Sequence, residues 1–162
     1  ESYNYNRKKF DLRKGSFLKD TTVSIRYFEV PGVTRPRPTA YVIPKSVAGI
    51  STILETARCN GIEYYETGSD EALALRKYKG SGKEASLLEE AVYAFDCGAY
   101  VFPMNQPSGI VLAILMEPDW RTTSRFPVSF VQAKLVGIDE LYRCEKDLVA
   151  GKVPSTAITI VK

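Results

Sequence analysis

The sequence predicts an α/β fold: a single domain whose mixed sheet is built from strand–helix (βαβ-type) units, preceded by an N-terminal strand segment. Two short apolar runs that end in proline, at 40–44 and 99–103, carry this prediction. Each run is followed by a small polar loop, a glycine–isoleucine pair and an apolar stretch. Continuous apolar runs are typical of strands buried on both faces, and alternating strands and helices are typical of α/β domains. A chain of 162 residues with 44% hydrophobic residues is long enough to bury one such core.

We divide the chain into an N-terminal strand and linker segment at 1–37, which could pack on an upstream domain, and an α/β domain at 38–162. Residues 1–20 are polar and basic, and we interpret them as a solvated lead-in in preference to a surface that binds an anionic partner. Residues 21–30 alternate between apolar and polar side chains, which predicts a half-buried strand. The Arg-Pro-Arg-Pro sequence at 35–38 predicts a short stiff linker, because proline fixes φ and restricts the residue before it.

The first strand–helix unit begins with a predicted strand at 40–43, which Pro44 ends. Ser46 is placed to cap the helix that follows. The helix is predicted from apolar residues that recur at helical spacing, namely Val47, Ile50, Ile53, Leu54 and Ala57. A helix stop at 60–61 and a strand at 62–65 complete a βαβ-type unit, for which we expect a right-handed crossover.

The second unit repeats this order, with a strand at 99–103 and a helix at 108–117 that Pro118 closes. An old duplication and two separate uses of one strand-to-helix solution explain the repeat equally well. Further strands are predicted at 73–78, 92–95, 141–143 and 157–161. The Gly-Ser-Gly-Lys sequence at 80–83 is interpreted as a hairpin turn and not as a phosphate-binding loop, because Glu84 occupies the position where that loop needs a hydroxyl.

The amino-acid composition excludes several classes of function. The chain has no histidine, which excludes Ser-His-Asp and Cys-His catalytic arrangements and every zinc site that uses imidazole. The net charge of +3 is too small to imply a nucleic-acid partner, and no apolar stretch is long enough to predict a membrane span. An odd number of cysteines, Cys59, Cys97 and Cys144, argues against a disulfide framework and for buried free thiols. We therefore predict no catalytic residue, no metal ligand and no cofactor in this chain.

Polar side chains in the two strand-to-helix loops are the candidate contacts for a ligand or another domain. Backbone N–H groups and the helix dipole converge at such loops, which is where α/β sheets bind ligands. The first loop supplies Ser46, and the second supplies Asn105, Gln106 and Ser108. We expect both loops on one edge of the domain, which would be its contact surface. The alternative is that Ser108 only caps the helix and that Asn105 only shapes the turn.

The segment at 38–118 resembles a domain of a known protein family. The sequences RPTAYVIP, GIEYYE and GAYVFPMNQPSGIVLAILMEPD are similar to the C-terminal accessory domain that follows the catalytic domain in bacterial carboxypeptidase A-like zinc metallopeptidases. The family pattern has a glutamine in the second loop, here Gln106, and a helix closed by Glu-Pro-Asp, here 117–119. The resemblance covers about half of the chain, and the family's His-x-x-Glu motif and later histidine have no counterpart in it.

The resemblance implies a non-catalytic C-terminal domain of a zinc metallocarboxypeptidase-like protein, with the zinc held by the parent's peptidase domain. Its partner would be the upstream peptidase domain of the same chain, and it could aid the binding of a peptide substrate. A first residue other than methionine fits a fragment of a longer protein. The rival hypothesis is a stand-alone module that binds a small ligand or peptide through Asn105, Gln106 and Ser108, and an enzyme that works through carboxylates or lysine is a third. The family suggests a location outside the cytoplasm, whereas free cysteines favour a reducing compartment.

Overall fold

The computed structural model describes the backbone of most of the chain. The described backbone covers 2–11, 16–26, 35–80, 85–118, 128–146 and 158–161, and side chains are described at 35–80, 85–118 and 128–146. The chain consists of two compact units, Glu1–Pro36 and Arg37–Lys162, and each is described by itself.

The first unit contains an antiparallel β-hairpin. Strand β1 (Ser2–Asp11) pairs with β2 (Ser16–Arg26), with Ser2 opposite Arg26. Strand β2 includes the first part of the strand predicted at 21–30, and residues 27–30 lie outside the described residues. No strand was predicted at the position of β1. Its start nevertheless alternates tyrosine and asparagine, and tyrosine is among the residues that favour strands.

The second unit is built on four strands whose neighbours all run antiparallel. In sheet order they are β9 (Tyr142–Cys144), β3 (Ala40–Pro44), β8 (Ala99–Pro103) and β4 (Tyr65–Glu66). Helix α1 (Ile50–Cys59) connects β3 to β4, so these two strands run parallel with β8 between them. Helix α2 (Gly109–Met116) and the short helix η1 (Ile138–Glu140) connect β8 to β9, which run parallel with β3 between them.

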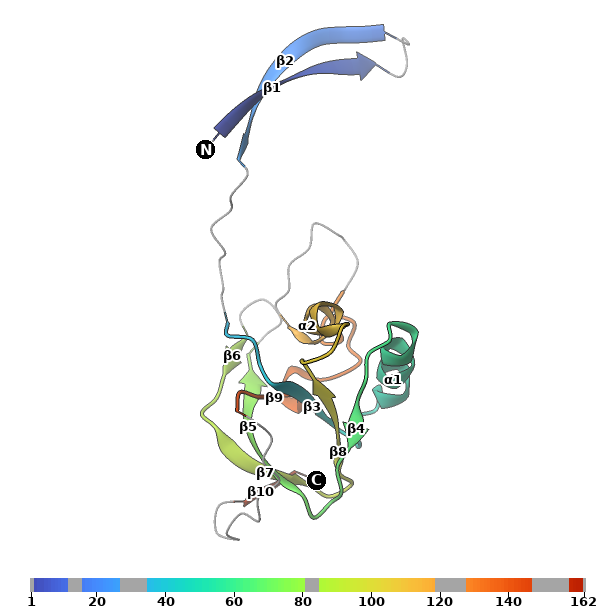
Figure 1. The fold of residues 1–162 in the computed structure, drawn as a ribbon, viewed down its shortest axis with the longest axis vertical. Helices are drawn as coiled ribbons and strands as arrows, with labels where there is room; N and C mark the ends of the chain where they lie inside the picture. Colours follow the sequence, from blue (N-terminus) through green and yellow to red (C-terminus); the bar gives the residue numbers. More distant parts are fainter. Residues whose placement is uncertain are drawn as a thin grey trace. The chain divides into compact units, whose positions relative to one another are not determined.

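The two strand–helix units are therefore interleaved (Figure 1). Each is a split βαβ unit whose two strands are separated by a strand of the other unit, and the resulting strand order is that of a ferredoxin-like βαββαβ arrangement. The predicted α/β class with a mixed sheet and strand–helix units is confirmed. The sequence could not show the interleaving, because that depends on which distant strands pair.

A second group of strands extends this sheet. It consists of β5 (Ala72–Lys79), β6 (Ser86–Leu87), β7 (Ala91–Phe95) and β10 (Ile158–Val161). The β4–β8 pairing sets Tyr65 opposite Val101, and the β5–β7 pairing sets Ala72 opposite Ala94, so both pairings keep one register. Strands β4 and β5 therefore form one arm of a long hairpin, and β7 and β8 form the other arm. The hairpin bends between the two pairings, and β5 also pairs with β9. Strand β10 runs parallel to β7, which makes the sheet mixed.

Two hydrophobic cores lie on opposite faces of β3 and β8. The first core includes Tyr41 and Ile43 from β3 and residues of both helices, so both helices cover the same face of the sheet. The second core includes Ala40 and Val42 from β3, together with residues of β5, β7 and β9 on the other face. The continuous apolar run predicted a strand buried on both faces. This prediction is confirmed, because every residue of β3 is buried.

Helix α1 begins later than predicted. It starts at Ile50 with Gly49 as its N-cap, and the predicted cap Ser46 is exposed in the preceding turn. A Cβ atom on Gly49 would lie 2.2 Å from the Leu135 carbonyl oxygen, so the close approach of these two backbone segments requires glycine. The helix ends as predicted, with Gly61 in the left-handed region at φ +62°.

The remaining predicted elements lie close to the observed ones. The strands predicted at 73–78, 92–95, 141–143 and 157–161 correspond to β5, β7, β9 and β10. The strand predicted at 62–65 is shorter, because only Tyr65 and Glu66 pair with β8. Of the hairpin turn predicted at 80–83, only Gly80 belongs to the described residues.

Candidate functional site

The two strand-to-helix loops lie at opposite ends of the sheet, which corrects our expectation of one shared edge. Strands β3 and β8 are antiparallel, with Pro44 opposite Ala99 and Ala40 opposite Pro103. The loop after β3, which holds Ser46, is therefore beside the start of β8. The loop after β8, which holds Asn105, Gln106 and Ser108, is beside the start of β3. A shared edge would require parallel neighbouring strands.

The side chain of Gln106 extends the β4–β8 ladder beyond its last backbone pair. The register places Glu63 opposite Pro103, and proline has no N–H to donate. The Gln106 amide takes the place of that missing group. Its Nε2 donates to the carbonyl oxygens of Glu63 at 3.0 Å and Pro103 at 2.5 Å, and its Oε1 accepts from the Glu63 N–H at 2.7 Å.

Ser108 connects the same two segments from the start of α2. It is the N-cap residue, but its side chain makes no capping hydrogen bond. The hydroxyl instead lies 3.0 Å from the carbonyl oxygens of both Asn60 and Gly61, to which it donates. Gln106 and Ser108 thus tie the loop after β8 to the segment after α1. Asn105, which directly precedes Gln106, is exposed, and Ser46 lies at the other end of the sheet.

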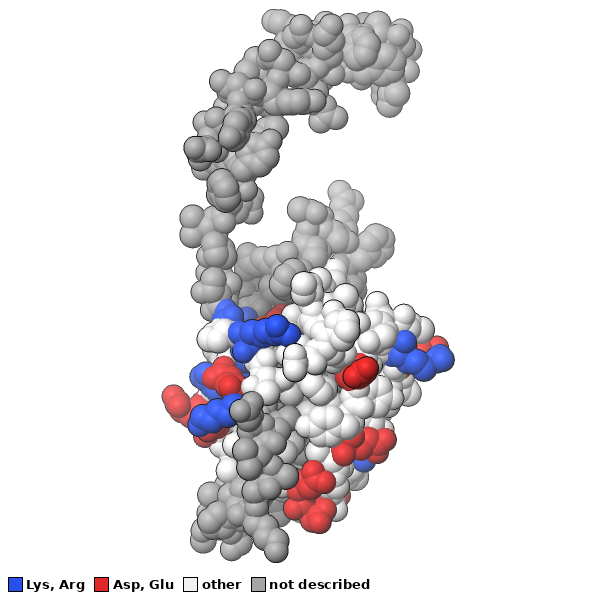
Figure 2. Space-filling view, in the orientation of Figure 1, with Lys and Arg blue, Asp and Glu red and all other residues white. Residues whose placement is uncertain are grey.

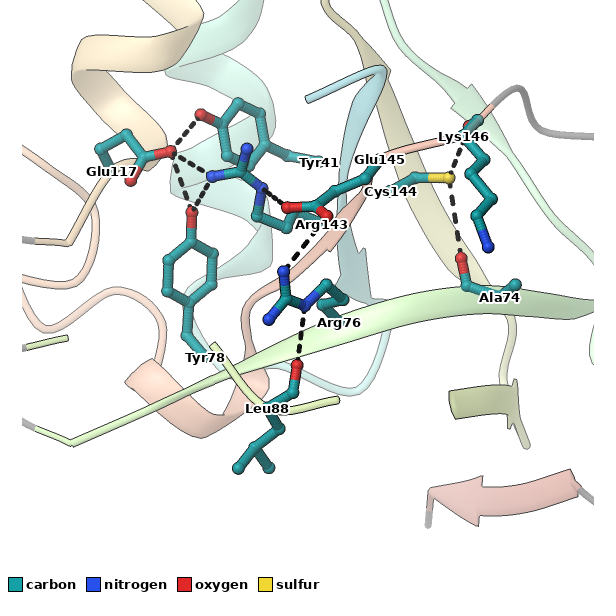
Figure 3. A network of polar contacts seen from close by, with 10 residues as sticks. All are labelled: Tyr41, Ala74, Arg76, Tyr78, Leu88, Glu117, Arg143, Cys144, Glu145 and Lys146. Atoms are coloured by element: carbon teal, nitrogen blue, oxygen red, sulfur yellow. Dashed lines mark hydrogen bonds and ion pairs between the residues drawn. The ribbon is translucent and has the colours of Figure 1, made fainter. Parts of the chain in front are cut away.

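A buried cluster of charged and phenolic groups lies between α2 and the sheet (Figure 3). The Arg143 side chain is fully buried, and its Nη1 lies 3.4 Å from Oε1 of Glu117, whose side chain is 13% exposed. The same carboxylate oxygen accepts hydrogen bonds from the hydroxyls of Tyr41 at 2.6 Å and Tyr78 at 2.9 Å. These groups connect the residue after α2 with strands β3, β5 and β9.

The charges alternate in sign on the other side of Arg143. Its Nε lies 3.5 Å from Glu145, and the other oxygen of Glu145 lies 3.2 Å from Nη1 of Arg76. The Nε of Arg76 donates to the carbonyl oxygen of Leu88 at 2.8 Å, which connects the series to the segment after β6. Since a buried charge is tolerated only when it is paired, this alternation accounts for the presence of an arginine in the core.

The two tyrosines of the cluster hold their protons firmly. Burial first, and then the negative charge of Glu117, raise the pKa of the Tyr41 hydroxyl and of the Tyr78 hydroxyl well above the ordinary value. Both hydroxyls therefore act as hydrogen-bond donors to Glu117 and not as bases at neutral pH. The arrangement holds α2 against the sheet.

Sequence reasoning missed Arg143, which lies at the centre of this cluster. A signal existed, because Arg143 interrupts a short run of residues that are otherwise apolar, at 141–144. An arginine within a buried strand indicates a buried carboxylate partner. Glu117 was predicted only as the last residue of a helix and as part of the Glu-Pro-Asp triplet. Nothing in the local sequence shows that it meets Arg143.

The cysteines and the acidic residues form no evident metal site in the described part of the chain. All three cysteines are free; Cys144 is buried as predicted, whereas Cys59 and Cys97 are exposed, against prediction. Among the described residues, no group of three or more Cys, Asp and Glu is placed to hold a metal ion. The described helices also include none with the length and apolar character needed to cross a membrane.

The outer face of α2, which we define as Ile110, Val111 and Ile114, is apolar and partly exposed. The helix sequence GIVLAILM has no polar side chain, and only Gly109, Leu112 and Met116 are fully buried. Ile110 is 78% exposed. In Figure 2 the surface between α2 and β8 is mostly free of charged side chains. A helix that is hydrophobic on all sides is normally covered on all sides, so this face is suited to contact with another surface.

Comparison of the chain with protein-family models, curated proteins and solved structures finds no match. The similarity to the accessory domain of zinc metallopeptidases therefore stays a prediction from the sequence.

Proposed function

We propose that this chain is a non-catalytic accessory domain that docks on another folded domain through the outer face of α2. Following the sequence resemblance, we further propose that the docked domain is the upstream peptidase domain of a zinc metallocarboxypeptidase-like protein. In this proposal the zinc and the reaction belong to that domain, and this chain shapes or extends its substrate-binding cleft.

The exposure of Ile110 is the observation that carries the proposal. Removing a large aliphatic side chain from water gains about 1.5–3 kcal/mol, so burial of this face would favour an interface that covers it. The segment that resembles the metallopeptidase accessory domain includes all of α2. The α2 face and the resemblance therefore point to the same part of the chain.

The buried cluster supports a non-catalytic role. Its one carboxylate with little exposure, Glu117, already accepts from two tyrosines and is paired with Arg143. The alternative, a stand-alone module that binds a ligand through Gln106, would need an amide that the Glu63 backbone already uses. We therefore prefer docking over ligand binding.

The first test is to read the gene upstream of the codon for Glu1. We expect an in-frame extension that encodes His-x-x-Glu and a later histidine. The two parts would then be made as separate polypeptides and their association measured by calorimetry. Ile110→Lys should weaken binding roughly 30-fold or more, because it places a charge in the apolar centre of the interface.

Thr52→Lys is the matched control, because Thr52 is exposed on α1 and lies outside the proposed interface. It should leave the association unchanged. Three results would overturn the proposal: an upstream start codon with no peptidase sequence, equal binding by the two lysine variants, or tight stoichiometric binding of zinc by this chain alone.

A further inference from the structure

Strand β4 forms one edge of the sheet in the second unit. Within the described part of the chain it pairs with β8 on one side and has no strand on the other. Edge strands present a row of backbone donors and acceptors that another chain can pair with. The residues before β4 are held extended, because the Gln106 amide clamps the Glu63 backbone. The edge is therefore formed before any partner arrives.

The direction of the backbone groups along this edge follows from the ladder. Thr67 donates its N–H to the carbonyl oxygen of Ala99 at 2.9 Å, so Thr67 faces β8. Glu63 also directs its N–H and carbonyl toward that side. Because the direction alternates along a strand, the backbone groups of Tyr64 and Glu66 point away from β8. Those groups are placed to pair with an added strand.

Side chains at this edge indicate the chemistry of the added strand. Tyr64 and Tyr65, which are 38% and 45% exposed, lie on opposite faces of the strand and can flank alternate side chains of a partner. Exposed acidic residues follow the same edge and the bend beyond it, namely Glu63, Glu66, Asp70 and Glu71. Lys45 offsets one of these charges by an ion pair of 2.7 Å with Glu66. Figure 2 shows acidic side chains gathered over β4 and the bend.

We propose that the edge of β4 binds an extended peptide rich in Lys or Arg by adding it to the sheet as a further strand. Backbone pairing with Tyr64 and Glu66 supplies the main contacts, and the acidic residues select a basic partner. The site is separate from the outer face of α2. Variants at the two sites therefore distinguish failure of this proposal from failure of the docking proposal.

The probe is an eight-residue peptide of alternating Lys and Val with blocked ends, titrated into the full chain and followed by backbone NMR. We expect amide shifts and slower hydrogen exchange at Tyr64 and Glu66. Two control peptides are needed. A version with Glu in place of Lys should not bind, and a version N-methylated at every residue should bind weakly, because it keeps the charge and loses the backbone donors on both edges.

The variant pair Glu66→Pro and Glu66→Ala separates backbone pairing from charge. Both remove the carboxylate, but only proline removes the outward N–H, which an edge strand tolerates. We expect Glu66→Pro to bind the Lys-Val peptide about fivefold more weakly than Glu66→Ala. Equal affinity of the two variants, or of the methylated and unmethylated peptides, would show attraction by charge alone and overturn strand addition.

Discussion

Helices α1 and α2 occupy equivalent places in the two interleaved units, yet their outer faces differ. Both pack on the same face of the sheet, α1 through Ile53 and Ala57 and α2 through Leu112 and Met116. The outer face of α1 carries polar and charged side chains, namely Ser51, Thr52, Glu55 and Arg58. The outer face of α2 carries only aliphatic ones.

This difference shows that the fold does not require an apolar outer face. Helix α1 has the amphipathic pattern expected of a helix with water on one side. Helix α2 packs on the sheet through its inner residues, and its outer isoleucines and valine are not among the residues of the first core. The ends of the helices differ as well. Helix α1 ends at a left-handed glycine, Gly61, whereas α2 runs into the partly buried carboxylate of Glu117.

The largest expected effect concerns the end of α2. Glu117→Ala removes the carboxylate that pairs with the fully buried Arg143 and accepts from Tyr41 and Tyr78. Breaking a buried pair leaves an uncompensated charge, so we expect a loss of about 3 kcal/mol in the free energy of unfolding. Urea denaturation measures it.

Glu55→Ala is the matched control on α1, because Glu55 is exposed on the outer face of that helix. It should change the free energy of unfolding by less than about 0.5 kcal/mol. A similar loss for the two variants would mean that the end of α2 is held by packing alone, and the contrast between the two helix ends would disappear.

A pH dependence follows from the same cluster. Burial, and then the charge of Glu117, raise the pKa of Tyr41 and Tyr78 above the ordinary value of 10.0, while the unfolded chain titrates near that value. Above pH 10 the unfolded state loses protons that the folded state keeps. Stability is therefore full below pH 10 and falls above it, by about 1.4 kcal/mol per pH unit for each such tyrosine.

Tyr41→Phe tests this dependence. Denaturation between pH 10 and 11 should show a shallower fall in stability for the variant than for the parent chain, although the variant starts lower because it loses a hydrogen bond to Glu117. Tyr142 also titrates late, since burial and then Tyr93 raise its pKa to about 12, so some slope persists. Parallel slopes in the variant and the parent would contradict the role given to Tyr41.

Local sequence patterns were sufficient for the elements but not for their arrangement. The runs at 40–44 and 99–103 are strands because a strand buried on both faces has no polar side to display. The same runs do not say that β8 inserts between β3 and β4. That order depends on pairing across long stretches of chain, and it places the two strand-to-helix loops at opposite ends of the sheet.

The polar residues also show that local sequence is not sufficient to predict their roles. Gln106 stood out in sequence as a potential ligand contact, but its role depends on the register that sets Glu63 opposite Pro103. Arg143 becomes understandable only once Glu117 and Glu145 are known to flank it. In both cases the partner comes from a distant part of the chain, and a window of local sequence does not contain it.

A smaller effect is expected where the loop after β8 meets the segment after α1. Gln106→Ala removes the amide that bonds the Glu63 backbone and should lower the free energy of unfolding by about 1–2 kcal/mol. Asn105→Ala, at the exposed neighbouring position, should change it by less than about 0.5 kcal/mol. If both variants behave alike in denaturation, Gln106 does not fasten this loop, and its use as a ligand contact becomes the better hypothesis.

The smallest effect on stability tests the comparison most directly. Ile110→Lys on α2 should change the free energy of unfolding by less than about 0.5 kcal/mol, as should Thr52→Lys on α1, because both positions are exposed. The two variants should differ in association instead. Without a partner, an apolar face favours contact between copies at high concentration, which sedimentation velocity detects as a concentration-dependent rise in mass. Ile110→Lys should reduce that rise and Thr52→Lys should not. A large loss of stability in Ile110→Lys would mean that the outer face of α2 belongs to the core, and it would remove the basis for docking.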